Sequence, residues 1–176
     1  MATHHTLQSS PQTVHWGYFD AALAPALRVR SGDKVTVNCI SGGPDEMPAA
    51  PYVVLPEHRE VHATHKPRLG AHILTGPIAV EGAMPGDTLE IRIHDIQLRT
   101  DWGYNTIRPL AGTLPEDFPM LRRMTIPIDR GAQGRHPAVG HRDSAQPFFG
   151  VMGVAPPPVY GAVTSITRAN MAAISI

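Results

Sequence analysis

Proline recurs along the whole of this chain and limits the length of any regular element. The 176 residues include 18 prolines and 16 glycines, both above average usage. Proline is poorly tolerated inside helices and central strands, because its ring clashes with the preceding turn and it has no backbone N–H to donate. The sequence therefore predicts a mainly β fold, a sandwich or barrel-like arrangement of short strands joined by Pro/Gly-rich turns, with little helix.

The stretch that shows this pattern best is residues 72–93. Two apolar alternations, at residues 78–80 and 89–93, have the period of two that is typical of half-buried strands. A Pro-Gly-Asp sequence at residues 85–87 separates them and has the residue types of a tight turn. We expect a β-hairpin here, and a second one at residues 26–40, where a Ser-Gly-Asp turn joins two further alternations.

Balanced charge excludes several classes of partner. Fifteen basic and fifteen acidic residues cancel, whereas binding to nucleic acid or to an anionic membrane surface favours a basic excess. No apolar run approaches the roughly 18 residues of a transmembrane helix, and the N-terminus lacks the features of a signal peptide. The single cysteine, Cys39, cannot form an internal disulfide and fits a reducing compartment; its place in an alternating segment predicts a packing role. We expect a cytoplasmic protein with no membrane or nucleic-acid partner.

Three histidines lie close together on a segment that predicts a short helix. His58, His62 and His65 are spaced i, i+4, i+7, so on a helix they share a face, and two histidines four apart can hold a metal. However, Arg59 occupies the position that glutamate takes in the H-E-x-x-H metal motif. A solvated helix turn is therefore preferred over a metal site by about three to one, since short motif matches carry a high false-positive risk.

Three further polar residues are candidates for a site. His72 precedes the first strand of the 72–93 stretch. The sequence leaves three roles open for this histidine: a metal ligand, a general base or a hydrogen-bonded loop residue. Glu81 follows that strand and points either to solvent or into a site. Asp101 begins a predicted aromatic turn at residues 101–105. The sequence contains no nucleophile elbow, P-loop or dinucleotide-binding glycine pattern.

Four long segments resemble the acetamidase/formamidase family. They are HWGYFDAALAPALRVRSGDKVTV at residues 15–37, HILTGPIAVEGAMPGDTLEIRI at residues 72–93, DWGYN at residues 101–105 and PFFGVMGVAPPP at residues 147–158. The resemblance implies hydrolysis of small linear amides, such as formamide or acetamide, to ammonia and a carboxylate. It also implies a mainly β fold, a cytoplasmic homo-oligomer, and a divalent metal, zinc or calcium, with unassigned ligands.

The same resemblance gives roles to the three candidate residues. A water molecule activated by a metal or a carboxylate is expected to attack the amide carbonyl, and hydrogen-bond donors are expected to hold the oxyanion. His72 is then a base or a ligand, Glu81 a base or a support for the ligands, and Asp101 a positioning residue. Each of the three has a structural role as its alternative.

The chain departs from the family pattern in ways that indicate the N-terminal part of such a domain at residues 1–176. The family's G-D-x-H…G-D-G-E type stretch and its G-G-N-x-D-N motif are absent. Residues 131–146 and 171–176 are suspected to be out of frame. Residues 134–145 can be back-translated so that another reading frame resembles the family's approach to Pro-Phe-Phe-Gly, and the last seven residues so that another frame gives Gly-Gly-Asn-Ile-Asp. Resequencing tests this hypothesis, since DNA that cannot be read as the family motifs in another frame rules it out.

Two functional alternatives remain open at this stage. The chain is part of an amide hydrolase and is expected to be poorly folded and inactive when made alone. Alternatively, it is an inactive truncated remnant or a non-catalytic β-module that needs a separate C-terminal half. Co-purification with a separate C-terminal polypeptide would distinguish a split enzyme from a decayed gene.

Overall fold

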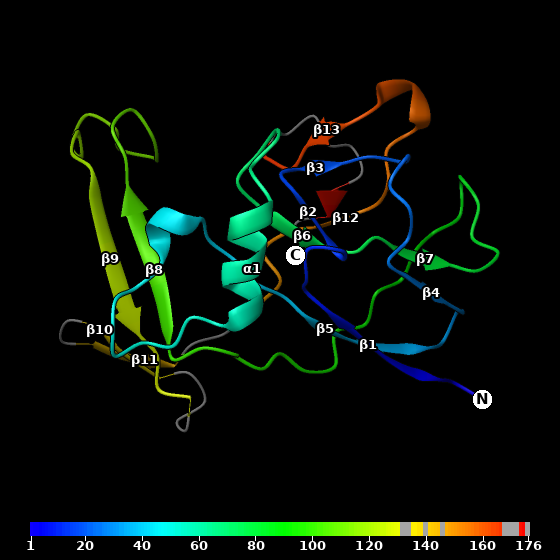
Figure 1. Ribbon diagram of the computed structural model, residues 1–176, viewed down its shortest axis with the longest axis horizontal. Coiled ribbons are helices and arrows are strands. Elements are labelled where there is room, and N and C mark those ends of the chain that lie inside the picture. Colours follow the sequence, from blue (N-terminus) through cyan, green and yellow to red (C-terminus); the bar gives the residue numbers. More distant parts are fainter. Residues whose placement is uncertain (131–134, 139–140, 145–146, 167–172, 175–176) are drawn as a thin grey trace. The chain divides into compact units, whose positions relative to one another are not determined.

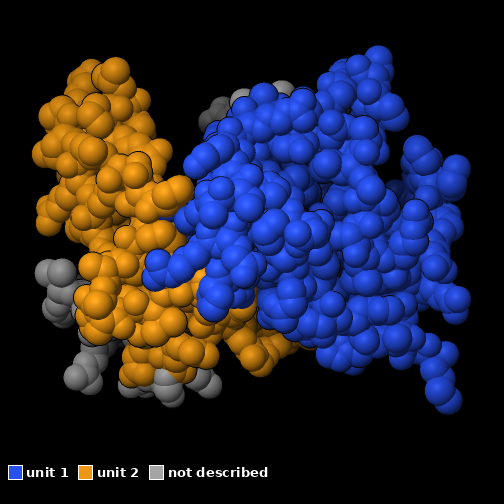
Figure 2. Space-filling model, viewed as in Figure 1, with its two compact units in different colours: residues 1–43, 56–93, 149–176 blue, residues 44–55, 94–148 orange. Residues whose placement is uncertain are grey.

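The computed structural model describes residues 1–130, 135–138, 141–144, 147–166 and 173–174. The chain divides into two units, which are coloured separately in Figure 2. Unit 1 consists of Met1–Gly43, Pro56–Ile93 and Phe149–Ile176, and unit 2 of Pro44–Leu55 and His94–Phe148.

Unit 1 is built from short strands and one helix, as Figure 1 shows. Its strands are β1 (His4–Gln8), β2 (Val14–Trp16), β3 (Tyr18–Phe19), β4 (Leu27–Val29), β5 (Lys34–Asn38), β6 (Ile73–Thr75), β7 (Ile78–Val80), β12 (Met152–Gly153), β13 (Val163–Thr164) and β14 (Ala173–Ile174). The helix is α1 (Pro56–Thr64), which begins at a proline, and a short 3-10 helix covers Pro158–Tyr160. Proline suits the first turn of a helix because its missing N–H has no partner there in any case. The predicted mainly β fold is confirmed.

Every sheet that the described residues form has two strands. In unit 1, β1 pairs with β5 and β4 with β7 in parallel, while β2–β6, β3–β13 and β12–β14 are antiparallel. No closed barrel is formed within this part of the chain. The core of unit 1 contains Leu7, Val14, Trp16, Val29, Ile40, Val61, Ile73 and Leu74.

The predicted hairpin at residues 26–40 is correct in its strands and wrong in its pairing. Both strands form, as β4 and β5, but each pairs with a distant strand in place of the other. The turn between them is present, because the Asp33 N–H donates to the Arg30 carbonyl at 3.0 Å. The parallel partners β1 and β7 place Leu7 and Val29 in the core, and that burial outweighs the local pairing suggested by the turn.

The predicted hairpin at residues 72–93 is correct only in its first half. The first strand is β7, and the turn is present: Gly86 has a φ of 101° and the Met84 N–H donates to the Asp87 carboxylate at 2.8 Å. Residues 88–99 contain no strand, so the second strand of the hairpin is wrong. Residues 88–98 form no backbone hydrogen bond with another described backbone segment, so no ladder is built there. Cys39 also departs from expectation, because its thiol is exposed and the predicted packing role is wrong.

Unit 2 contains two antiparallel pairs and a short 3-10 helix at Pro44–Glu46. Strand β8 (Trp102–Ile107) pairs with β9 (Arg122–Pro127), and β10 (Arg135–Ala138) pairs with β11 (His141–Ser144). The predicted turn at residues 101–105 is therefore wrong, since most of it lies in β8. The buried Trp102 indole donates to the Val53 carbonyl at 2.8 Å, which fixes this strand against the first segment of the unit.

The suspected out-of-frame windows at residues 131–146 and 171–176 lie partly outside the described residues. Within these windows the structure describes only the backbones of β10, β11 and β14. The frameshift hypothesis therefore stays a prediction. No helix in the described part of the chain has the length and apolar character needed to cross a membrane.

Candidate functional site

The β2–β6 ladder in unit 1 organises the candidate site. Its register pairs His15 with Leu74 and Trp16 with Ile73, and directly opposite residues in an antiparallel pair share a face of the sheet. His72 directly precedes β6, just beyond the last paired residue, Ile73. The backbone continues the ladder, because the Gly17 N–H donates to the His72 carbonyl at 2.8 Å.

His72 makes a specific contact across a long sequence separation. Its Nδ1 lies 3.0 Å from Oγ of Ser165, and Ser165 is buried while His72 is half-buried. Strand β13 brings Ser165 here through its pairing with β3, and the Ser165 N–H donates to the Gly17 carbonyl at 2.9 Å. The contact fixes the orientation of the imidazole ring and leaves Nε2 as the atom available for proton transfer when Nδ1 carries the proton.

Two glycines make this arrangement sterically possible. Gly17 has a φ of +89°, and a Cβ on it would lie 2.2 Å from the Gly70 carbonyl oxygen. A Cβ on Gly70 would lie 2.7 Å from Oγ of Ser165. Only residues without a side chain allow the backbone to approach so closely and to adopt this φ.

His15 is a second imidazole of the same ladder. It is buried, and its Nδ1 has no hydrogen-bond partner among the described residues. Burial lowers the pKa of His15, and a backbone hydrogen bond at Gly76 partly opposes this. The ring meets Tyr18 edge-on at 5.5 Å, and the Arg68 guanidinium carbon lies 4.8 Å above the Tyr18 ring. His15 is therefore a neutral imidazole at pH 7.

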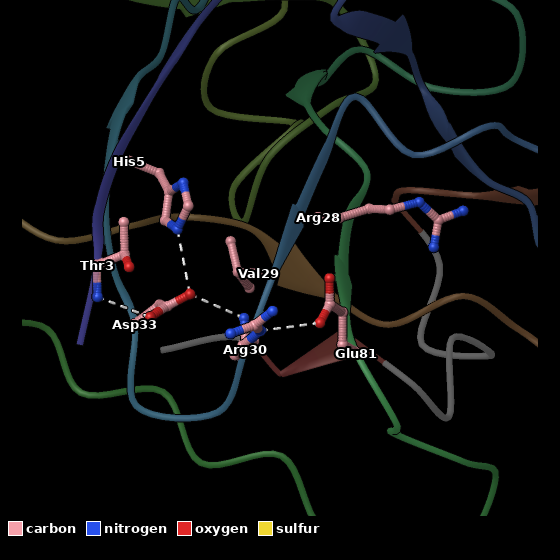
Figure 3. A pocket seen from close by; sticks show the side chains of 7 residues that line it. All are labelled: Thr3, His5, Arg28, Val29, Arg30, Asp33 and Glu81. Carbon is pink, nitrogen blue, oxygen red and sulfur yellow. Dashed lines mark hydrogen bonds and ion pairs between the residues drawn. The ribbon is translucent and has the colours of Figure 1, made fainter. Parts of the chain in front are cut away.

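Glu81 belongs to a different place in unit 1, a surface cavity of about 290 Å³ that Figure 3 shows. Its carboxylate pairs with Nε of Arg30 at 3.1 Å, and both side chains are largely exposed. The cavity is lined by Thr3, His5, Arg28, Val29, Arg30, Asp33 and Glu81, and His72 is not among them. Glu81 is thus held by an arginine and is not brought to the His72–Ser165 pair.

Asp33 supplies a second carboxylate of the same cavity. Its oxygens accept the N–H of Arg30 at 2.9 Å and the N–H of Thr3 at 2.8 Å, and they lie 3.1 Å from Nε2 of His5. These contacts, the Arg30 N–H first, lower the pKa of Asp33 to about 2. The carboxylate remains ionised and ties the start of β1 to the turn before β5.

Asp101 belongs to unit 2, unlike His72 and Glu81. Its Oδ1 is buried without a hydrogen-bond partner in the described residues, and its carbonyl accepts the Ile128 N–H at 2.7 Å. The three residues predicted from sequence are therefore not gathered within one unit, and each has different contacts.

The histidines of α1 are packed, so the preferred prediction of a solvated turn is wrong. Nε2 of His58 and Nε2 of His62 lie 3.3 and 2.9 Å from the same carbonyl oxygen, that of Gly42. His58 is buried, and the His62 ring stacks on Trp16 at 5.5 Å. His65 instead contacts the Thr64 hydroxyl at 3.0 Å. His58 and His62 thus share a face of α1, and this face contacts Gly42 and Trp16 within unit 1.

Metal-binding residues do not gather in the part of the chain that the structure describes. No group of three or more His, Cys, Asp or Glu side chains is placed to hold an ion there, and a protein metal centre of the expected kind uses at least three such ligands. The described residues therefore do not fit a metal site by themselves. The zinc or calcium ion implied by the resemblance stays a prediction that needs ligands from elsewhere.

Sequence reasoning missed His15 and Ser165. His15 stands in the alternating aromatic segment before Gly17, and a histidine at an inward position of a strand was the available signal. Ser165 had no signal, because only the β3–β13 pairing brings it to His72.

Comparison with known proteins agrees with the sequence resemblance. Residues 3–168 match the model of the family described as the Acetamidase/Formamidase family. The crystal structure of acetamidase from Bacillus halodurans is 26% identical with a TM-score of 0.68, and the match covers 90% of this chain and 48% of that one. A search of curated proteins found no match.

A second solved structure supports the fold alone. The recombinant predicted acetamidase/formamidase from Thermoanaerobacter tengcongensis is 22% identical with a TM-score of 0.72, and the match covers 93% of this chain and 49% of that one. This chain therefore spans about half the length of the solved structures that it matches. With a family match over nearly all of its residues, the chain belongs to the acetamidase/formamidase family.

Proposed function

We propose that this chain takes part in the hydrolysis of a small linear amide, such as formamide or acetamide, to ammonia and a carboxylate. Family membership over residues 3–168 supports the reaction class. The observation that carries the proposal for this chain is the 3.0 Å contact between His72 and Ser165, because it gives one imidazole of the family's characteristic segment a fixed orientation.

The proposed chemistry uses His72 as the proton carrier. When Nδ1–H of His72 donates to Oγ of Ser165, Nε2 has a free lone pair and accepts a proton from the attacking water. A bond forms from the water oxygen to the amide carbon, and the carbonyl becomes an oxyanion that needs hydrogen-bond donors. The protonated Nε2 then gives its proton to the leaving nitrogen as the C–N bond breaks, which releases ammonia and the acid.

The surroundings of His72 support this assignment. Nδ1 of His15 has no partner in the described residues, and His15 belongs to β2, whose partner strand β6 directly follows His72. We assign it to hold the substrate amide by a hydrogen bond. Glu81 and Asp101 stay predicted site residues, and Glu81 in this role would first have to leave Arg30. The homo-oligomer and the cytoplasmic location implied by the resemblance also stay predictions.

The test measures ammonia release from acetamide and formamide. The full 176-residue chain is assayed alone and after co-expression with the part of the Bacillus halodurans acetamidase that this chain does not match, taken as its second half. We expect activity only in the second case, with His72→Gln lowering kcat by about 10²- to 10⁴-fold, the range for loss of a general base. His65→Gln is the matched control, because His65 directly follows α1 and its Nδ1 contacts the Thr64 hydroxyl.

The result also distinguishes the second candidate function, a non-catalytic β-module. That alternative is favoured by the half-length match and by the lack of a three-ligand group in the described residues. Co-purification of the two polypeptides without ammonia release would support the module. Ammonia release that His72→Gln leaves unchanged would refute the assigned role of His72.

A further inference from the structure

Residues 88–93 in unit 1 have the conformation of a strand without a strand beside them. Nε of Arg92 and Oε1 of Glu90 are 2.7 Å apart, although the two residues are only two positions apart. Side chains at i and i+2 do not face each other in a helix, whereas they lie on one side of an extended chain. The ion pair therefore indicates that this segment is extended. It also indicates that Glu90 and Arg92 lie on the same face of the segment.

The opposite face of the same segment is apolar and uncovered. Leu89, Ile91 and Ile93 alternate with the charged pair, and they are 42, 46 and 39% exposed. Apolar side chains on one face and charged ones on the other are typical of a strand whose apolar face packs on a core. None of residues 88–93 is in a strand, and their backbone groups form no hydrogen bond with the backbone of another described residue, so within the described part of the chain both the apolar face and the backbone groups are available for pairing.

Two other observations bear on the partner that such a face would take. Every sheet among the described residues has only two strands, and a two-stranded sheet is marginal by itself. The solved acetamidase-type structures match 90% and 93% of this chain, yet the match covers only 48% and 49% of their own lengths. Those relatives thus contain a further half of similar size in the same chain.

We propose that residues 88–93 are the docking strand for the second half of an acetamidase-type polypeptide. An extended segment with free N–H and C=O groups can be added to the sheet of a partner, with backbone hydrogen bonds for affinity and alternate side chains for specificity. Leu89, Ile91 and Ile93 pack into the core of that partner, and Glu90 with Arg92 remains on the outer face. A second copy of this chain is the competing occupant, and the experiment below separates the two.

The experiment begins with the full 176-residue chain alone. We expect it to bind the dye ANS, with a fluorescence that falls at least twofold in the variant carrying Leu89→Lys, Ile91→Lys and Ile93→Lys. Val159→Lys is the first control, since Val159 is an exposed apolar residue of unit 1 outside the segment. Equal ANS fluorescence in the wild type and the triple-lysine variant would overturn the proposal.

The second measurement adds the partner. The tagged chain is co-expressed with the second half of the Bacillus halodurans acetamidase, and both co-purification and amide hydrogen exchange are recorded. We expect co-purification and at least tenfold slower exchange at residues 88–93, both lost in the triple-lysine variant. Both are retained when Glu90→Gln and Arg92→Gln are introduced together, because these side chains lie on the outer face.

Each remaining outcome decides against the proposal. Failure of the wild-type chain to co-purify, or unchanged exchange at residues 88–93 in the complex, would overturn it. Concentration-dependent protection of these amides in the chain alone, with a dimer by light scattering, would show that a second copy covers the strand. These readouts are independent of amide hydrolysis, so the docking strand and the proposed function can fail separately.

Discussion

The close approach of Gly17 to Gly70 gives a prediction that two matched variants can test. Gly17→Ala and Gly32→Ala both place a Cβ at a residue with a φ of +89°, but the Cβ meets the Gly70 backbone at 2.2 Å in the first case and nothing within 4 Å in the second. The left-handed conformation costs about 1–2 kcal/mol in both variants. Forcing backbone apart adds about 1–3 kcal/mol at Gly17 alone, the usual cost of overpacking.

Amide hydrogen exchange measures this difference locally. The N–H of Ser165 donates to the Gly17 carbonyl and the N–H of Arg68 to the Trp16 carbonyl, so both report on the opening of this contact. An extra 1–3 kcal/mol corresponds to about 5- to 150-fold faster exchange at these two amides in Gly17→Ala than in Gly32→Ala. The Asp33 amide, in the turn beside Gly32, is the internal control.

The result that refutes this reasoning is equal exchange in the two variants. In that case the chain would absorb a Cβ at Gly17 by a small backbone shift, and the close approach would not hold Ser165 beside His72. Loss of protection at Ser165 together with lower amidase activity in the complex would connect the two glycines to the proposed site.

Three other predictions concern stability. The pKa of Asp33 is lowered to about 2 from 3.8, so the ionised carboxylate stabilises the fold fully above pH 3.8 and this stabilisation is lost as the pH falls towards 2. Asp33→Asn should therefore make the free energy of unfolding less dependent on pH at the acid end of a denaturation profile. An unchanged acid dependence would contradict this role of Asp33. Burial lowers the pKa of His15, so just below pH 6.5 the unfolded chain binds more protons than the folded chain, and the free energy of unfolding should fall there. Urea titrations at pH 7.5 and 5.5 measure this fall, and His15→Phe should remove it. Trp16→Phe removes the indole donor to the Ala71 carbonyl at 3.0 Å and should destabilise unit 1 by about 1–3 kcal/mol in urea unfolding, whereas a loss below that range would show that water replaces the bond.

Local chemistry in the sequence was sufficient for the turns and for several strands. The Pro-Gly-Asp turn that ends at Asp87 and the Ser-Gly-Asp turn that ends at Asp33 form as predicted, because glycine tolerates positive φ and aspartate accepts backbone N–H groups nearby. The helix at Pro56 and the mainly β character also follow from short-range preferences. The family resemblance is a property of the sequence too, and the family match over residues 3–168 confirms it.

Strand pairing and the candidate site were decided only by the tertiary structure. Strands β4 and β5 form where their alternation predicts them, yet each pairs with a distant strand, since burial of apolar side chains and not proximity in sequence selects the partner. His72 was visible as a candidate, whereas its partner Ser165 lies 93 residues away and reaches it through the β3–β13 pair and two glycines. A sequence pattern specifies which face of a strand is apolar, but what covers that face depends on the rest of the fold, and the exposed side chains of Leu89, Ile91 and Ile93 show this most directly.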